Sequence, residues 1–347
     1  MQTAQTAQTA KLPFPLASAH PSMDPAYVIR NWNYTISFDI ICFSLWSTVH
    51  SPHNPSYSTY TAIMSDGAMN DHGVFNHNNS VAPKTERILP LFSLKGKTAI
   101  VSGAGAGIGL AVAQGFAEAG ANIAIWYNSN KKAIERAADI EKEYGVKCLS
   151  FPLPNLLPSW ERKILHTYAI IKQSGKAYQV DVTDCDAVKA AVDAQVKEFN
   201  GRLDVFVANS GIPWTQGAAL EGEVAHYHKV VSTDLDGTFY CARAAGNHFK
   251  RQGLEGTDMN GKKLENYSYG SFVATASMSG HIVNIPQLQA AYNAAKAGII
   301  MLIKSLATDW VKFARANSVS PGYMATEISD FVPKKTKDIW KSKIPMG

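Results

Sequence analysis

The amino-acid sequence predicts an α/β fold, a doubly wound parallel sheet with helices on both faces. Two observations predict it. Short apolar runs of strand length alternate along the chain with longer segments of helical period. A glycine-rich turn lies between the first run and the first helical segment. Such alternation is typical of parallel strands joined by crossover helices, which cover both faces of the sheet.

The predicted strands and helices follow one another in order from residue 92. Gly120 closes the first helix, and Asp184 can cap the helix after the third strand. Two longer helices are predicted around 225–250 and 289–313. The six predicted strands are the apolar runs 97–103, 121–127, 176–182, 203–209, 270–277 and 314–322.

Composition allows one large or two modest domains and argues against several kinds of partner. The 347 residues are 46% apolar, and the net charge of +5 is mild. No dense cluster of Lys and Arg with interleaved aromatic residues is present, so nucleic acid is not an expected partner. No membrane span or signal peptide is recognisable. The four cysteines are scattered without metal-ligand spacing, which predicts no metal site and reduced thiols in a cytoplasmic protein.

Residues 1–91 and 92–347 differ in pattern. The first segment opens on the repeat MQTAQTAQTA and stays polar and turn-rich, so we interpret it as an extension that is disordered or an error of the gene model. Within the domain 92–347, the segment 149–175 interrupts the alternation, with three prolines in its first half. It is either a functional insertion or a retained intron. We favour the intron, because the flanks join without it as an ordinary helix, loop and strand.

The sequence SGAGAGIG forms the turn between the first strand and the first helix. Gly103 permits the tight turn, Gly107 lets the backbone approach a pyrophosphate, and Gly109 lets helix and strand pack closely. The N-terminus of the following helix offers unpaired N–H groups to the phosphates. In this context the motif predicts a dinucleotide site. The turn residues assigned to it are Ser102, Gly103, Gly107, Ile108 and Gly109.

The end of the second strand bears on which dinucleotide binds. An NAD site usually places an acidic residue there for the ribose 2′-OH, but the sequence from 126 to 131 contains none. Asn128, Ser129 and Lys131 could accept a 2′-phosphate, which favours NADP(H). Alternatively, these residues form an ordinary polar loop, and the choice of cofactor stays open.

Tyr292 and Lys296 are spaced i, i+4 and share one face of a predicted helix. This spacing alone is common on helix surfaces. Its surroundings strengthen it as a sign of a functional pair, because a strand ends upstream in the serines Ser277 and Ser279 and the helix is crowded with alanines. Small side chains of this kind allow close packing against a cofactor or a second subunit.

From about Phe92 the chain resembles the short-chain dehydrogenase/reductase family. The resemblance rests on SGAGAGIG, VDVTD, VANSG, the serine turn, YNAAK and SPGYMATE. The detailed wording around the serine turn and after the sixth strand is similar to the fungal subgroup of NADP-dependent sorbose reductases, mannitol 2-dehydrogenases and carbonyl reductases. The resemblance does not extend to residues 1–91 and 149–175. It implies a Rossmann-like fold and, for an intact form, a homotetramer or homodimer.

The resemblance also implies catalytic roles. Tyr292 would protonate a carbonyl oxygen as hydride arrives, and it would act as the base in reverse. The ammonium of Lys296 would stabilise the phenolate and bind the nicotinamide ribose. Ser277, by the subgroup's spacing, would hold the substrate oxygen, with Ser279 in support. Asp234 stands where the family often has a catalytic asparagine, and its charge would alter any proton relay.

Further cofactor contacts carry over one at a time. Asn209 would fix the backbone near the adenine ribose, and Gly211 follows it in the same motif. Asp181 and Val182 would flank the adenine. Four residues at and after the end of the sixth predicted strand would border the nicotinamide and its carboxamide, namely Pro321, Gly322, Met324 and Thr326.

The expected function is NADP(H)-dependent interconversion of a ketose and its polyol. A reductase of non-sugar ketones and an inactive cofactor-binding fragment are the alternatives. After Gly347 the family continues with another helix and a seventh strand, so we expect the C-terminal edge strand to be missing. We therefore expect a chain that is poorly active or unstable as written.

Overall fold

The structure is a computed structural model that describes residues 87–149 and 177–345. The chain separates into two units, Met1–Gly67 and Ala68–Gly347. The first unit lies wholly outside the described residues, and the account below concerns the second. The predicted extension therefore lies outside the described residues up to position 86, and the predicted insertion does so from position 150.

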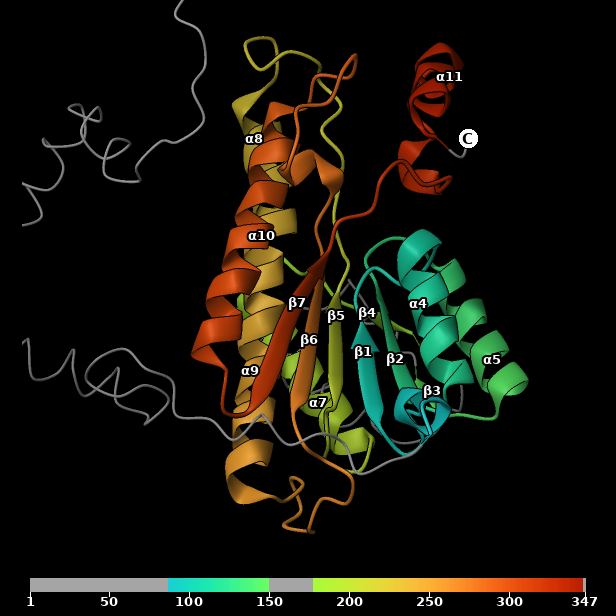
Figure 1. Cartoon of the computed structure of the whole chain (residues 1–347), viewed down its shortest axis with the longest axis vertical. Coiled ribbons are helices and arrows are strands. Elements are labelled where there is room, and N and C mark those ends of the chain that lie inside the picture. The colour runs from blue at the N-terminus through green and yellow to red at the C-terminus, as the bar shows by residue number, and fades with distance from the viewer. Residues whose placement is uncertain (1–86, 150–176, 346–347) are drawn as a thin grey trace, which may run out of the picture. The chain divides into compact units, whose positions relative to one another are not determined.

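A parallel sheet forms the middle layer of the second unit (Figure 1). Its strands are β1 (Thr98–Val101), β2 (Asn122–Tyr127), β3 (Cys148–Leu149), β4 (Tyr178–Gln179), β5 (Val205–Ala208), β6 (Gly270–Thr275) and β7 (Ala314–Val319). Every hydrogen-bonded pair of these strands is parallel. The order is β3-β2-β1-β5-β6-β7, with β4 beside β2. The chain thus winds outward from β1 in one direction and from β5 in the other, as in a doubly wound sheet. Within the described residues, β7 ends the order on one side.

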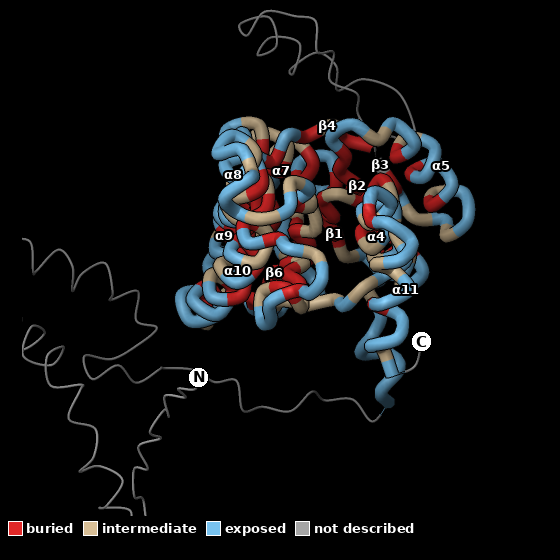
Figure 2. Tube along the Cα trace, turned by 90° about the horizontal axis from the view of Figure 1, so that it is seen from above, coloured by how far each residue is buried: buried red, intermediate tan, exposed pale blue. Residues whose placement is uncertain are grey.

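Helices cover both faces of this sheet (Figure 2). The helices are α4 (Gly107–Glu118), α5 (Lys132–Tyr144), α7 (Cys185–Glu198), α8 (Val224–Val231), α9 (Gly237–Glu255), α10 (Ala290–Asp309) and α11 (Lys334–Lys343). Short helical turns are η2 (Leu89–Phe92), η3 (Ser232–Asp236), η4 (Met278–Gly280) and η5 (Glu327–Ser329). α4 and α5 lie on one face, and α7, α9 and α10 lie on the other.

Alternate residues of the strands supply one hydrophobic cluster to each face. In β1, Ile100 joins the cluster formed with α7, α9 and α10, whereas Ala99 and Val101 join the cluster formed with α4 and α5. This follows from the two-residue period of a strand. In the first cluster the rings of Phe206 and Phe272 stack with centroids 5.6 Å apart. The predicted fold class, a doubly wound parallel sheet, is confirmed.

The third strand is divided between two stretches of the chain. The sequence predicts one strand over 176–182, but β3 and β4 both pair with β2. Cys148 lies opposite Ile123, and Tyr178 lies opposite Trp126. The two partners in β2 are three positions apart, and Cys148 and Tyr178 would be three positions apart if 149–175 were left out. β3 and β4 therefore hold the register of a single strand.

The helix predicted around 225–250 is interrupted near its middle. α8 ends at Val231, the π-helical turn η3 follows, and α9 begins at Gly237. Asp234 lies within η3 and is completely buried. The hydroxyl of Thr238 donates to the Asp234 backbone carbonyl at 2.6 Å. π-helical turns occur frequently at functional sites.

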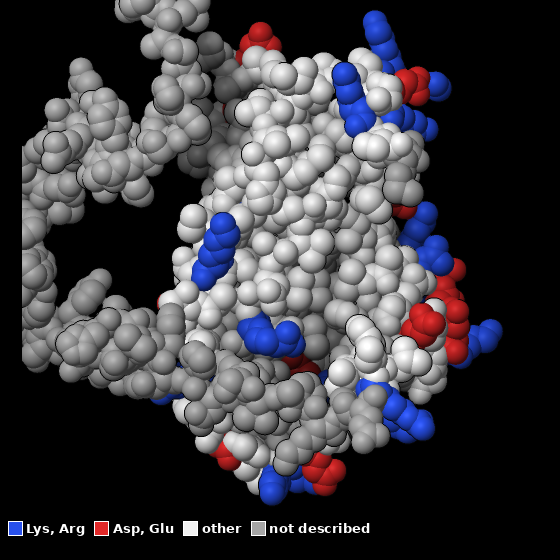
Figure 3. Space-filling view, in the orientation of Figure 1, with Lys and Arg blue, Asp and Glu red and all other residues white. Residues whose placement is uncertain are grey.

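On the face shown in Figure 3, most charged side chains lie toward the edges, and acidic and basic groups mix beside α5. Among the residues that the structure describes, no helix has both the length and the apolarity to cross a membrane. Within the same ranges, His, Cys, Asp and Glu side chains form no group of three that could hold a metal ion.

Candidate active site

The predicted site residues gather where the strands end. Carboxyl ends of parallel strands meet at one edge of a sheet, and ligands of such sheets bind there. The segments that follow β1, β2, β5, β6 and β7 carry Ser102, Asn128, Asn209, Ser277 and Pro321 respectively.

The glycine turn after β1 depends on missing side chains. Gly103 and Gly107 have φ angles of 62° and 56°, a backbone region that favours glycine. A Cβ atom on Gly109 would lie 2.4 Å from the carbonyl oxygen of Gly103. α4 begins at Gly107 without a side-chain cap, so its first N–H groups remain open to an anion. The turn fits the diphosphate of a dinucleotide. Ile108, in the first turn of α4, is half-buried.

Asn209 ties this turn to two other strands. The backbone N–H groups of Asn209 and Ser210 donate to Ser102 Oγ at 2.9 and 3.0 Å. The Asn209 amide donates to the carbonyl of Gly103 at 3.1 Å and accepts from Thr275 Oγ1 at 3.0 Å. The carboxyl ends of β1, β5 and β6 are thereby locked together.

Lys296 and Asp234 form a buried ion pair beneath this edge. Lys296 Nζ lies 3.1 Å from Asp234 Oδ2 and donates to the carbonyl of Thr275 at 3.0 Å. Asp234 Oδ1 accepts from the backbone N–H of Ile212 at 2.8 Å. A Cβ atom on Gly211 would lie 3.0 Å from Asp234 Oδ2, so glycine leaves room for the pair.

Burial and charge act in opposite directions on this pair. Burial raises the pKa of the Asp234 carboxyl, while the Lys296 ammonium opposes the rise. Burial alone would lower the pKa of Lys296, but Asp234 and Tyr292 outweigh burial and raise it. Lys296 therefore remains a cation at neutral pH. Its Nζ lies 5.4 Å from the centroid of the Tyr292 ring.

The two serines occupy different environments in the turn after β6. Ser277 caps η4, and its Oγ accepts from the backbone N–H of Ser279 at 3.1 Å. Ser279 Oγ accepts from Gln289 Nε2 at 3.1 Å. A Cβ atom on Gly280 would lie 2.8 Å from the backbone carbon of Lys296. The serine turn thus rests directly on α10, beside the tyrosine–lysine segment.

Tyr292 is half-buried and packs beside a small hydrophobic cluster formed by Trp214, Val230 and Ala291. Trp214 is buried and stacks on the His226 ring at a centroid distance of 4.9 Å. Trp214 could not be identified from the sequence, because its contact with α8 and α10 depends on the tertiary fold.

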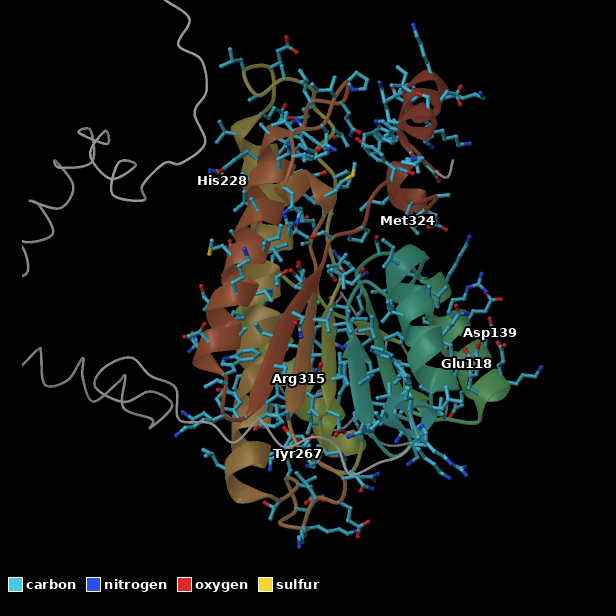
Figure 4. All side chains as sticks on the ribbon, viewed as in Figure 1. Glu118, Asp139, His228, Tyr267, Arg315 and Met324 are labelled. Atoms are coloured by element: carbon cyan, nitrogen blue, oxygen red, sulfur yellow. The ribbon has the colours of Figure 1, made fainter. Side chains whose placement is uncertain are left out.

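The segment after β7 connects both halves of the site. The carbonyl of Pro321 accepts from the backbone N–H of Met278 at 3.0 Å. The side chain of Thr326 would lie 3.3 Å from a Cβ atom on Gly107, so this segment reaches back to the glycine turn. Figure 4 labels Met324 between β7 and α11. Gly322 and Met324 are both exposed.

α11 is connected to the site through an aromatic stack. The rings of Tyr323 and Trp340 lie nearly parallel, with centroids 3.8 Å apart. Asn284 Nδ2 donates to the Tyr323 hydroxyl at 3.0 Å, and Asn284 is buried. The loop between the serine turn and α10 is therefore joined to the last described helix.

A groove of about 470 Å³ lies where β2 and β4 end and α8 begins. Asn128, Asp181 and Thr183 line its strand side. Asp181 Oδ1 accepts from both the backbone N–H and the hydroxyl of Thr183, at 2.9 and 2.7 Å. Val182 is buried and Ser129 is exposed, and neither lines the groove. The opposite wall includes His228, Lys229, Ser232 and Asp236, which the sequence did not single out.

Asn130 is another residue that the sequence did not single out. Its side-chain amide donates to the carbonyl of Gly105 at 3.4 Å and accepts from the backbone N–H of Lys132 at 3.2 Å. It lies one residue before the N-cap of α5, Lys131, and its bond to the backbone N–H two residues on is the kind of turn that asparagine favours. That signal could have identified it as a link between the glycine turn and α5.

A glycine turn at the carboxyl edge of a parallel sheet, beside a helix bearing tyrosine and lysine, defines a nicotinamide-dependent oxidoreductase acting on CH–OH groups. Residues 97–153 match the family model described as short chain dehydrogenase, and residues 162–347 match the one described as enoyl-(acyl carrier protein) reductase. The chain belongs to the short-chain dehydrogenase family. The predicted family resemblance is confirmed.

Several relatives cover most of the chain. An L-xylulose reductase of Hypocrea jecorina is 58% identical over 80% of this chain and 86% of its own length. A probable NADP-dependent mannitol dehydrogenase of Yarrowia lipolytica is 46% identical over 76% and 80%. The crystal structure of an NADPH-dependent 3-quinuclidinone reductase from Rhodotorula rubra is 34% identical, with a TM-score of 0.63 over 78% of this chain and 86% of that one.

Proposed function

We propose that this protein is an NADP(H)-dependent reductase that interconverts a ketose of the sorbose, fructose or xylulose type and its polyol. The observation that carries the proposal is the position of Lys296. Its side chain is buried, and its Nζ lies 5.4 Å from the centroid of the Tyr292 ring. Both residues lie on α10, the helix against which the serine turn packs. The names of the xylulose reductase and mannitol dehydrogenase relatives support the substrate class.

The residues of the chain supply acid–base chemistry and orientation. Bound NADPH would supply the hydride for the carbonyl carbon. Tyr292 donates its phenolic proton to the carbonyl oxygen in reduction and accepts a proton from the alcohol in oxidation. The Ser277 hydroxyl donates a hydrogen bond to the same oxygen and stabilises its developing charge. The Lys296 ammonium stabilises the phenolate until a proton returns from solvent.

The glycine turn holds the diphosphate, and Asp181 with Val182 borders the adenine. Asn209 and Gly211 position the ribose end, and the segment after β7 borders the nicotinamide. This assignment is supported by the common edge at which these residues lie.

NADP(H) is favoured over NAD(H) because no carboxylate follows β2. Asn128 and Ser129 are exposed at its end, where an acidic side chain would repel a 2′-phosphate. Asn128→Asp is expected to raise the KM for NADPH at least tenfold and to leave the KM for NADH unchanged or lower. Steady-state kinetics with both coenzymes test this. An unchanged ratio of the two KM values would contradict the assignment.

The catalytic assignment is tested with purified protein by following NADPH oxidation with L-xylulose, sorbose, fructose and an aryl ketone. Turnover of a ketose is expected to exceed that of the aryl ketone. Tyr292→Phe should bind NADPH normally and lose at least a thousandfold in kcat. Undiminished turnover in that variant would refute the proposal.

Two other outcomes distinguish the alternatives. Preference for the aryl ketone would identify a reductase of non-sugar ketones, in line with the name of the quinuclidinone reductase. NADPH binding without turnover of any ketone would identify an inactive cofactor-binding fragment.

The proposal includes a homodimer or homotetramer in the cytoplasm. Exposed Phe239 on α9 and Met301 on α10 support association, and three free cysteines among the described residues fit a reducing compartment. Light scattering on the purified protein tests the assembly, and a fluorescent fusion tests the location.

A further inference from the structure

The loop between η4 and α10 exposes its apolar side chains and buries a polar one. Ile282, Val283 and Ile285 are 55%, 75% and 77% exposed, whereas Asn284, which lies among them, is 2% exposed. The hydrophobic effect favours the reverse arrangement, because apolar surface gains most by leaving water. A buried polar side chain is therefore the informative feature of this loop, and it needs hydrogen-bond partners.

The side-chain amide of Asn284 is only partly satisfied. Its Nδ2 donates to the Tyr323 hydroxyl at 3.0 Å. Its Oδ1 is buried and has no hydrogen-bond partner among the residues that the structure describes. Turning the amide over would leave the nitrogen unpaired instead, because Tyr323 offers a single hydroxyl. A buried polar group without a partner is unfavourable, so a further hydrogen bond to this amide would be stabilising.

Asn284 lies along the border between the serine turn and the segment after β7. Three contacts join these two stretches of chain in order, namely Met278 to Pro321, His281 to Ser320, and Asn284 to Tyr323. The first contact adjoins Ser277, and the loop that carries the third leads into α10 and Tyr292. A substrate whose carbonyl lies between Ser277 and Tyr292 can therefore extend the rest of its chain along this border.

We propose that Asn284 is a specificity-determining residue whose side-chain amide hydrogen-bonds a hydroxyl group of the substrate, away from the reacting carbonyl. This inference rests on the proposed function and deepens it. A hydroxyl group both donates and accepts, so it can pair with either amide atom. Because Oδ1 is closed to solvent, the side chain of Tyr323 has to shift as the hydroxyl binds. A ketone without hydroxyl groups leaves the amide unpaired, and the site discriminates against it.

The test uses the ketose that the wild-type protein reduces fastest. Asn284→Ala is expected to raise the KM for this ketose about tenfold, while kcat and the KM for NADPH change less than threefold. Asn284→Leu, which keeps the side-chain volume, should give the same result if the alanine variant folds poorly. Tyr323→Phe breaks the same hydrogen bond but leaves the amide in place, so it should raise the KM less than threefold.

Asn122→Ala is the matched control. Asn122 accepts from the backbone N–H of Lys147 at the start of β2, the opposite end of that strand from Asn128, and its loss should leave the KM for the ketose unchanged. An unchanged KM in both Asn284 variants, or an equal rise in Tyr323→Phe, would overturn this inference alone. Full turnover in Tyr292→Phe, or no ketose reduction by the wild type, would instead overturn the proposed function.

Discussion

Ser277 and Ser279 show how contacts separate two residues that the sequence offers together. Ser279 Oγ already accepts from Gln289, whereas Ser277 Oγ accepts only from a backbone N–H in its own turn. Each hydroxyl accepts one hydrogen bond and keeps its own proton free to donate, and what distinguishes Ser279 is that its Oγ is tied to the side chain of Gln289 at the start of α10. The assignment of the substrate oxygen to Ser277 rests on the predicted spacing to Tyr292. The sequence alone could not weigh these contacts, because Gln289 reaches the turn only after α10 packs against it.

The two serines are predicted to differ in catalysis. Ser277→Ala should lower kcat by about two to three orders of magnitude, because it removes a hydrogen bond to the developing charge. Ser279→Ala should lower kcat by less than tenfold, since it frees only the Gln289 amide. Steady-state kinetics on both variants check this, and a larger loss for Ser279→Ala would reverse the assignment.

Gly109 provides a test of close packing in the dinucleotide turn. A Cβ atom there would lie 2.4 Å from the Gly103 carbonyl oxygen, so Gly109→Ala should cost about 1–3 kcal/mol in the free energy of unfolding and weaken NADPH binding. Gly115, in the same helix, is the matched control because nothing lies within 4 Å of its Cβ position. Gly115→Ala should stabilise the protein by about 0.5–1 kcal/mol. Urea denaturation of both variants measures the difference, and equal effects would contradict the packing argument.

At the scale of elements, most strands and helices could be predicted from their apolar runs and helical periods, and the ends of α4 and α7 also from Gly120 and Asp184. Asp184 caps α7 as expected, accepting from the backbone N–H of Ala187 at 2.9 Å. Two elements differ from their predictions. η3 interrupts the long helix and carries Asp234, which contacts both Ile212 and Lys296, and β4 is shorter than expected because β3 supplies the start of the same strand.

The register of β3 and β4 leads to a deletion experiment. Removing 149–175 would join Cys148 to Lys176 and keep Tyr178 opposite Trp126. Because the two halves would no longer be separated along the chain, the free energy of unfolding should rise by about 3 kcal/mol. Denaturant unfolding of the shortened protein checks this.

A deletion of 149–174 is the control for that experiment. It leaves one extra residue in the strand, and a shift of one residue turns every side chain to the opposite face. With that shift, the side chains of Ala177 and Tyr178 could not stay buried while the backbone of Tyr178 stays opposite Trp126 in β2. If both deletions stabilise the protein equally, β3 and β4 do not act as one strand.

At the scale of the whole molecule, the fold and the common edge of the site followed from the sequence, whereas the groups around each catalytic atom did not. The alternation of strands and helices determines where strand ends meet, and so places Asn209, Ser277 and Pro321 near one another. Patterns in one dimension carry no signal for Trp214 beside Tyr292, or for His228 and Lys229 across the groove from Asn128. Those contacts join segments that are distant in the sequence.

The contact between His248 on α9 and Asp193 on α7 should make the free energy of unfolding depend on pH. His248 is buried and lies 2.7 Å from Asp193. Burial lowers the pKa of His248, Asp193 opposes this, and Arg251 and Lys189 lower the pKa further. The folded protein then binds fewer protons at this group than the unfolded chain. Stability should be greatest above about pH 6.5 and fall as the pH drops below that value.

Thermal unfolding between neutral and mildly acidic pH measures this dependence. His248→Gln should flatten the decline, while the exposed control His228→Gln should leave it unchanged. An equally steep decline without His248 would assign the effect to other groups. Asp193 adds its own loss only at lower pH, because its pKa is lowered through the hydrogen bonds from Lys189 and His248, which outweigh its burial.

The stack of Trp340 on Tyr323 has an optical consequence. An indole held face to face with a phenol, with its Nε1 buried and unpartnered among the described residues, emits differently from one surrounded by solvent. Any event that parts the two rings should therefore change the fluorescence of the protein. The helix α11 thus carries a spectroscopic reporter of its contact with the segment after β7.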